Sequence, residues 1–301
     1  MEAFFLALAV AIGSLLMLLA NPAGELEPRW AALLLELGLG AGFGMAIVSL
    51  LFFVLILVHA ALPMVMFPAE AALLIASAGL LLLGIKRRSG KRLGSNAPGF
   101  WWYRILGGAL VVQVLLVAAA MTNTARTSPY GNWDAWAIWN LRAKYLAGPG
   151  DTWKRAFSPL LVFSHPDYPP LLSGFVAQVW KFSGRGTANL VPSLTAAAFA
   201  ASVLVLLVSA LTLVRGTGSG LLAGLVLLSP SSFLMLPMSQ YADVPLSFYY
   251  LATLVLALLS ARSEGSRKAG LAALAGASAS LAAWTNLINS SEARIVAQKA
   301  H

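Results

Sequence analysis

Three short clusters of polar residues interrupt an otherwise apolar chain, and their side chains are of types that catalyse group transfer. The first cluster runs from Tyr130 to Leu146 and holds Asp134, Arg142 and Lys144. A carboxylate can take a proton from a hydroxyl group that lies within about 2.6–3.2 Å, and cations can balance the charge of a departing phosphate. The first cluster therefore holds the residue types needed for transfer from a phosphate to a hydroxyl group.

The second cluster runs from Ser164 to Leu171 and contains three prolines. Proline removes a backbone donor and pushes the residue before it into an extended conformation, so a regular helix is excluded. We expect a rigid turn that carries His165, Asp167 and Tyr168.

The third cluster, from Gln240 to Pro245, lies where an apolar segment re-enters the membrane, and it holds Tyr241 and Asp243. All three clusters belong to the same side of the membrane in the topology derived below. We expect them to converge on one external cavity.

Each polar residue also has a structural interpretation. Asp134 and Asp243 are typical helix N-caps, the latter because a proline follows it in the first turn. Asp167 can close an Asx turn, and His165 can hydrogen-bond within its turn. With three histidines and no cysteine in the chain, we expect no zinc-like ligand set; a divalent metal held by carboxylates stays open as a cofactor.

The composition predicts a membrane protein. Hydrophobic residues make up 59% of the 301 residues and charged residues only 10%, and the mean hydropathy is +0.80. A soluble domain has about 25% charged residues. The basic residues behind the net charge of +9 lie in the connections between apolar runs. This distribution is better explained by membrane orientation and by contact with lipid phosphate than by nucleic-acid binding.

The expected fold is an all-α, multi-pass membrane bundle of about eight spans, because about 20 apolar residues cross a bilayer. The spans are expected near residues 2–20, 31–58, 61–84, 103–122, 187–213, 219–236, 241–260 and 269–284. Glycines at 38, 40, 42 and 44 should let the second span bend or pack closely on a neighbour. Glu36 and Glu70 lie in or near apolar segments, where ionisable groups are often functional.

The basic segment 86–102 predicts the orientation, since short basic connectors face the cytoplasm. We expect a three-span region over 1–85, this connector, and a second membrane region over 103–285 whose loop, 123–187, lies outside. The segment from Tyr130 to Leu146 should form one helix along the membrane surface, with three Trp residues as interfacial anchors. Regular spacing would place Trp136, Asn140 and Lys144 on one face.

The order and shared side of the clusters resemble the polytopic glycosyltransferases of the GT-C superfamily, in particular the RgtA/B/C/D-like group, which is related to aminoarabinose transferases and protein mannosyltransferases. The resemblance rests on Asp134 after an outward-running span, on the His165-Pro-Asp-Tyr-Pro-Pro turn and on Tyr241-Ala-Asp-Val-Pro. It covers roughly residues 103–285.

The resemblance implies a sugar donor on polyprenyl phosphate and a lipid, glycan or protein acceptor at the outer face of a bacterial cytoplasmic membrane. Asp134 matches the acidic residue thought to activate the acceptor hydroxyl. Asp243 matches the acidic residue at the second outer re-entry, which shapes the site or helps bind a metal in some members. The residues expected to bind substrate are Arg142, Lys144, His165, Asp167, Tyr168, Tyr241 and Asp243.

Two other interpretations stay open. A lipid or polyprenol-phosphate transporter would use Glu36, Glu70 and the outer basic residues to line a path. Relatives generally continue with further spans, whereas the chain passes abruptly after Trp284 into the polar tail 286–301. This change predicts a truncated or frameshifted product, or a natural short member, and it allows a non-catalytic remnant.

Overall fold

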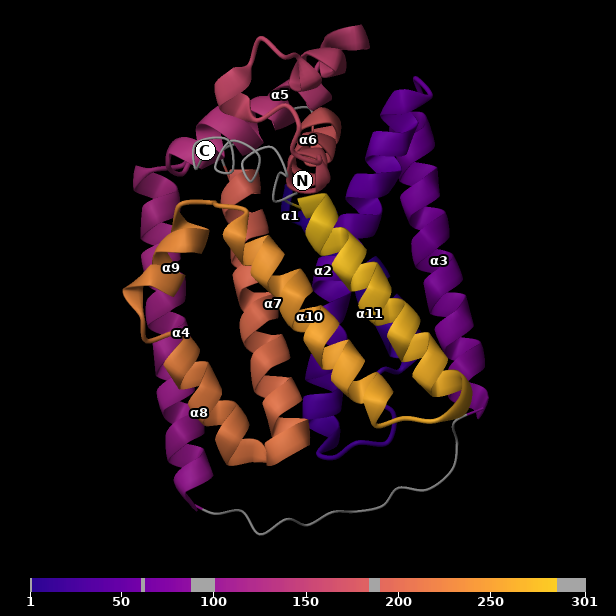
Figure 1. Ribbon diagram of the computed structural model, residues 1–301, viewed down its shortest axis with the longest axis vertical. Coiled ribbons are helices and arrows are strands. Elements are labelled where there is room, and N and C mark those ends of the chain that lie inside the picture. The colour runs from indigo at the N-terminus through magenta and orange to yellow at the C-terminus, as the bar shows by residue number, and fades with distance from the viewer. Residues whose placement is uncertain (1, 61–62, 88–100, 184–189, 286–301) are drawn as a thin grey trace, which may run out of the picture.

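The computed structural model of the chain describes residues 2–60, 63–87, 101–183 and 190–285 (Figure 1). These residues form helices and turns without a strand. Several of the helices are long and apolar enough to cross a membrane. The expected all-α, multi-pass membrane bundle is therefore confirmed. The tail 286–301 and most of the basic connector lie outside the described residues.

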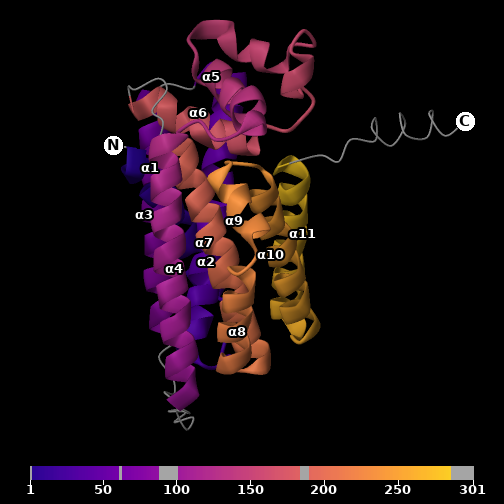
Figure 2. The same ribbon diagram turned by 90° about the vertical axis from the view of Figure 1, so that its left-hand side faces the viewer.

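The membrane bundle consists of α1 (Glu2–Ala20), α2 (Arg29–Leu57), α3 (Pro63–Arg87), α4 (Trp101–Thr127), α7 (Leu190–Arg215), α8 (Thr217–Leu227), α9 (Ser231–Met238), α10 (Asp243–Ala261) and α11 (Gly265–Thr285). The outer loop, residues 128–183, holds the π-helix η1 (Ala135–Asn140), α5 (Leu141–Ala147), the 3-10 helices η2 (Gly150–Phe157) and η3 (Val162–Ser164), and α6 (Leu171–Ser183). In Figure 2 the outer loop rises above the bundle and extends over the side of α10 and α11.

The described chain has fewer clear spans than the eight expected. Six helices meet the length and hydropathy of a span, and the pair α8 and α9 makes a seventh if it is counted as one bent span. The last expected span is the helix α11, which lies beside α10 (Figure 1). Alanine, glycine and serine dominate α11, so it is long enough to span but less apolar than the others.

The sixth expected span is broken in its middle. The axes of α8 and α9 differ by 69° across a short break, and Pro230 is the residue that precedes α9. Its ring and its missing N–H group prevent a continuous helix. Because α8 has 11 residues and a helix rises about 1.5 Å per residue, the break lies near the middle of a bilayer core of about 30 Å.

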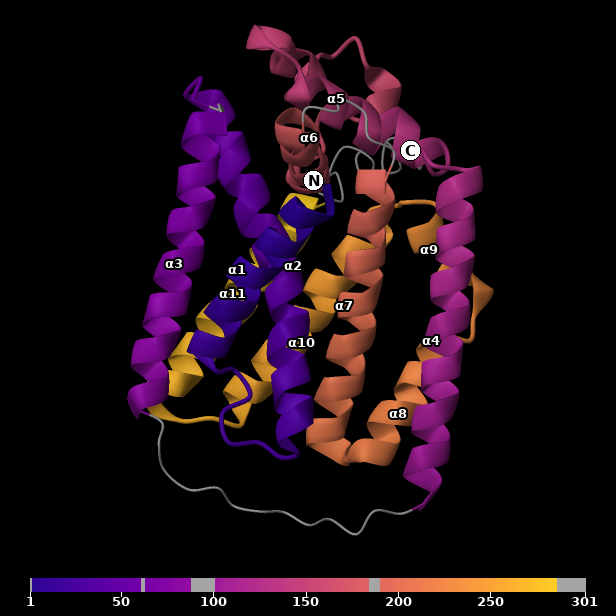
Figure 3. The same cartoon turned by 180° about the vertical axis from the view of Figure 1, so that it is seen from behind.

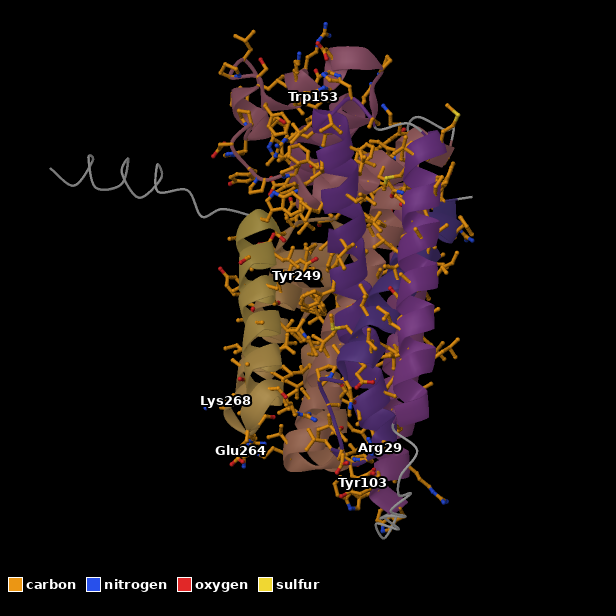
Figure 4. All side chains as sticks on the ribbon, turned by 90° about the vertical axis from the view of Figure 1, so that its right-hand side faces the viewer. Arg29, Tyr103, Trp153, Tyr249, Glu264 and Lys268 are labelled. Carbon is orange, nitrogen blue, oxygen red and sulfur yellow. The ribbon has the colours of Figure 1, made fainter. Side chains whose placement is uncertain are left out.

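The bundle has two distinct ends. The outer loop covers one end, which we name the loop end, and the connections from α1 to α2, α7 to α8 and α10 to α11 lie at the other, the connector end (Figures 1 and 3). In Figure 4, Trp153 marks the loop end, whereas Arg29, Glu264 and Lys268 lie at the connector end. Arg29, Arg215 and the basic connection from α10 to α11 thus share one end, where the positive-inside rule expects a cytoplasmic face, while the outer loop at the other end also carries Arg and Lys residues.

Helix α2 occupies the centre of the bundle and packs against α1, α6, α7 and α10. In Figures 1 and 3, α10 and α11 lie on one face of α2 and α1 on the other. Any side chain at Gly40 or Gly44 would collide with the backbone of α1 at Ser14 or Ala9. The expected close packing through glycine is therefore confirmed, and the N-terminal spans belong to the same core as the helices that follow.

Candidate functional site

Backbone and amide hydrogen bonds join the start of the outer loop to the segment before α10. The backbone N–H of Asn132 donates to the Ser239 carbonyl oxygen over 3.2 Å, and the Asn132 side-chain amide donates to Ser239 Oγ over 2.8 Å. Gly131 adopts a positive φ of 70° and lies so close that a side chain there would meet the Ser239 carbonyl oxygen. These contacts bring the first and third sequence clusters together.

Tyr241 lies close enough to the two carboxylates that the sequence singles out for their charges to act on its phenol. Partial burial and the negative charges of Asp134 and Asp243 raise the pKa of the Tyr241 phenol above its ordinary value. Asp134 is half-buried and Asp243 is exposed. The structure thus places the predicted base and the predicted second carboxylate in one electrostatic neighbourhood.

Neither carboxylate is used as a helix cap. Asp134 precedes η1 in helical backbone conformation, but its side chain makes no capping hydrogen bond. Asp243 is already the first residue of α10, whose N-cap is Ala242. The capping interpretation of the sequence is therefore not what the structure shows, and both carboxylates are left near the surface of the loop end.

The second cluster forms the expected turn and packs on the first. The backbone N–H of Tyr168 donates to the His165 carbonyl oxygen over 3.0 Å. The Tyr168 ring stacks on His165 with centroids 4.5 Å apart and on Trp139 with centroids 5.7 Å apart. Around this stack, Leu172 and Ala242 join the buried side chains of η1. The three clusters therefore converge on one small apolar core.

The segment expected to be one regular helix is divided into η1 and α5. A π-helix has more residues per turn than an α-helix, so the expected grouping of Trp136 with Asn140 is wrong. Trp136 is 49% exposed, whereas Asn140 is buried. Trp133 is also exposed and lies beside Trp136 with ring centroids 4.6 Å apart, while Trp139 belongs to the core. Two of the three Trp residues thus remain available as interfacial anchors.

Arg142 is fully buried, unlike a cation that meets an incoming phosphate. It has 0% exposure, and none of its guanidinium nitrogens has a hydrogen-bond partner among the described residues. Its guanidinium carbon lies 5.2 Å from the centroid of the Phe157 ring. Burial lowers the pKa of Arg142 to about 10, and the charge of Asp167 opposes this shift. Arg142 therefore stays charged at neutral pH inside the outer loop.

Replacing Arg142 by Met should leave the protein as stable as the wild type or more stable, by about 1–4 kcal/mol in the free energy of unfolding. The reason is that a buried charge with poor partners is often replaced by an apolar side chain of similar volume without loss. Denaturant unfolding followed by circular dichroism measures the change. The matched control Arg155→Met alters an exposed arginine of the same loop. A marked loss of stability confined to Arg142→Met would mean that the guanidinium has a firmly bound partner in solution.

Lys144 is exposed on α5 and points away from the buried side of the helix that carries Arg142, as its sequence spacing predicts. Asp167 is exposed in the turn of the second cluster. The predicted residues thus fall in two places. The charges of Asp134 and Asp243 act on Tyr241, whereas Arg142 is buried elsewhere in the outer loop, where the charge of Asp167 acts on its pKa. Among the residues that the structure describes, no group of three or more His, Asp or Glu side chains is placed to hold a metal ion.

A large apolar cavity of about 580 Å³ opens between α4, α7 and α9 below the outer loop. Its walls include Val117, Met121, Leu194, Leu204, Phe233 and Met238. Arg126 in the last turn of α4 and Ser193 in the first turn of α7 provide polar groups at the loop end of this lateral cavity. None of the site residues predicted from the sequence lines it.

The sequence reasoning missed two residues that matter for this geometry. Arg126 is one of the basic residues expected on the outer side, and its place at the end of a long apolar helix marks it as a cation at the membrane surface. Gln240 begins the third cluster, where its residue type indicates no particular role. Its side chain is buried and bonded to three other segments, a role that no local sequence pattern indicates.

No protein-family model matches the chain, and no curated protein or solved structure matches it significantly. The resemblance of the three clusters to GT-C glycosyltransferases is thus still an expectation.

Proposed function

We propose that this multi-pass membrane protein is a glycosyltransferase that transfers a sugar from a polyprenyl-phosphate donor to an acceptor at the outer face of the bacterial cytoplasmic membrane. The observation that carries the proposal is the position of the lateral cavity. It offers an apolar surface for a hydrocarbon chain, has Arg126 at the end nearest the outer loop, and lies beneath that loop, which holds Asp134. Asp243 begins α10, directly after the segment to which the loop is hydrogen-bonded.

In the proposed reaction Asp134 accepts the proton of the acceptor hydroxyl, whose oxygen attacks the anomeric carbon of the sugar. The bond between that carbon and the phosphate oxygen breaks, and polyprenyl phosphate leaves with the bonding electrons. A cation near the phosphate balances its growing charge. Asp134 suits the role of base because its carboxylate makes no capping bond, and Arg126 suits the role of cation because it is exposed at the cavity.

Mass spectrometry of lipid-linked sugars tests the proposal in cells with and without the gene. Cells that lack the protein should accumulate one polyprenyl-phosphate sugar, and the wild-type gene should clear it. Identical lipid profiles in the two strains would contradict the proposed activity. The accumulated lipid would also identify the sugar.

Replacing Arg126 by Gln should weaken use of the lipid-linked donor by about 10- to 100-fold in kcat/KM. A hydrogen bond to a charged group contributes about 1.5–3 kcal/mol, and each 1.4 kcal/mol is about tenfold. Transfer from a radiolabelled donor into acceptor by protein in lipid vesicles provides the measurement. The control Arg104→Gln changes an exposed arginine near the other end of α4 and should leave transfer unchanged. Equal effects of the two substitutions would exclude a specific role for Arg126.

The break between α8 and α9 favours a second candidate, a lipid or polyprenol-phosphate transporter. Transporters use broken helices near the middle of the bilayer, and Leu228 and Phe233 on either side of this break line the lateral cavity. Glu70 is one of the two carboxylates expected to line the path of a transporter. It is buried in α3 and accepts a hydrogen bond of 2.7 Å from the Gln178 amide of α6. If vesicles that contain the protein move a labelled polyprenyl phosphate across their membrane and transfer no sugar, the result would favour transport. If the protein neither transfers the sugar nor moves the lipid, the result would favour the third interpretation, a non-catalytic remnant.

A further inference from the structure

Gln240 connects three segments that are distant in sequence. Its side-chain amide nitrogen donates hydrogen bonds to the Pro129 carbonyl oxygen over 3.0 Å and to Ser193 Oγ over 2.9 Å. Its Oε1 accepts a hydrogen bond from the Asn140 amide over 3.3 Å. With 5% exposure, the residue is buried. One side chain therefore ties together the start of the outer loop, the end of η1 and the start of α7.

The backbone of Gln240 supports a dedicated role for this side chain. Its φ is +59°, in the left-handed region that glycine occupies far more readily than residues with a side chain. Such a conformation persists where the surrounding contacts determine it. Glycine would relieve the conformation but would remove all three hydrogen bonds, so the contacts explain why a side chain is found here.

The partners of Gln240 belong to both parts of the proposed site. Ser193 lines the lateral cavity, and the next residue in the chain is Tyr241, which lies beside the carboxylates. Asn140 is the last residue of η1, the helix that Asp134 precedes. A displacement of η1 relative to α10 would therefore change the separation of Asp134 from Asp243.

We propose that Gln240 is a positioning residue, which holds η1 against α7 and the start of α10 so that Asp134 stays beside Tyr241 and Asp243 and in register with the wall of the lateral cavity. The effect of Gln240 on catalysis rests on the proposed function, whereas its effect on the position of Asp134 rests on the hydrogen bonds alone. Gln240 acts through Asp134 and does not itself contact the substrate. A side chain of the same length without an amide cannot replace it, because it offers neither donors nor an acceptor.

The first test measures transfer by the variant Gln240→Met, which keeps the length of the side chain and loses the amide. We expect kcat to fall about a hundredfold with little change in KM, because a displacement of about 1 Å at a reacting group can lower the rate by this factor. Gln113→Met makes the same substitution on the exposed helix α4, outside the cavity lining, and should retain the wild-type rate.

The second test needs no activity. Besides burial, the charge of Asp134 raises the pKa of Tyr241. An NMR titration of ring-labelled tyrosine measures the pKa of Tyr241, and the variant Tyr241→Phe identifies its resonance. In Asp134→Asn the pKa of Tyr241 should fall toward its ordinary value. If Gln240 positions Asp134, then Gln240→Met should produce a similar fall and Gln113→Met none.

Gln240→Gly protects the test against misfolding, because glycine accepts the positive φ while losing the same three bonds. It should show the same loss of kcat and the same fall in the Tyr241 pKa. An unchanged Tyr241 pKa in both Gln240 variants would overturn the proposal. The wild type itself could fail to transfer sugar while the titration responds as expected. In that case the positioning role of Gln240 stands and the proposed function fails.

Discussion

Replacing Asp134 by Asn is expected to abolish sugar transfer while leaving the protein folded and inserted in the membrane. Asparagine has nearly the same shape as aspartate but cannot take a proton from the acceptor hydroxyl. The loss of a general base lowers a rate by about 100- to 10,000-fold. The fold should tolerate the change because Asp134 is only half-buried and its side chain caps no helix.

Transfer from a purified lipid-linked donor, measured together with thermal unfolding, separates the effect on the reaction from an effect on the fold. Asp151→Asn is the matched control, since Asp151 is an exposed carboxylate of the same loop that pairs with Lys154 over 2.7 Å. We expect it to retain transfer. Wild-type activity in Asp134→Asn would remove Asp134 from the mechanism and would leave Asp243 as the carboxylate to examine.

Replacing Gly44 by Leu should lower the stability of the bundle more than any change in the outer loop. A Cβ atom at Gly44 would overlap the Ala9 carbonyl oxygen and would lie 3.0 Å from the Gly13 nitrogen. These are backbone atoms of α1, which cannot rotate away as a side chain can. Overpacking typically costs about 1–3 kcal/mol, occasionally more, and we expect a value at or above the upper end because α1 and α2 must separate.

Unfolding in mixed detergent micelles, followed by circular dichroism, measures this loss. Gly108→Leu is a matched control within a span, because Gly108 is exposed on α4 and no atom beyond the neighbouring backbone of its own helix lies within 4 Å of the added Cβ. Its stability should stay within about 0.5 kcal/mol of the wild type. If both variants unfolded together with the wild type, the close packing of α1 on α2 would not hold in the membrane.

Much of the bundle could be predicted from local sequence because a bilayer imposes a simple requirement on composition and length. The apolar runs locate the long helices to within a few residues, and the positive charges near Arg215 and Lys268 mark one common end. The misjudged span had a local signal: Pro230, flanked by serines, interrupts the apolar run where α8 and α9 bend.

The candidate site was less predictable because its geometry depends on contacts between distant residues. The three clusters converge as expected, but on a packed apolar core around Trp139 and Tyr168. The predicted site residues do not line the lateral cavity. The predicted grouping of Trp136 with Asn140 on one helix face was wrong because a π-helix, with more residues per turn, follows Asp134 in place of a regular α-helix. Nothing near Arg142 in the sequence indicates that it is buried, since that depends on Phe157 in a different helix.

The sequence by itself determined that this is a helical membrane protein with one large polar loop, because apolar length and charge act locally in a bilayer. It also identified Asp134 and Asp243 as the carboxylates to consider. Only the tertiary structure decided that Asp134 comes near Tyr241 and Asp243, that Arg126 and not Arg142 meets the lateral cavity, and that Gln240 joins the two regions. The physical reason is that side chains 47 to 111 positions apart meet only where packed helices bring them within hydrogen-bonding distance.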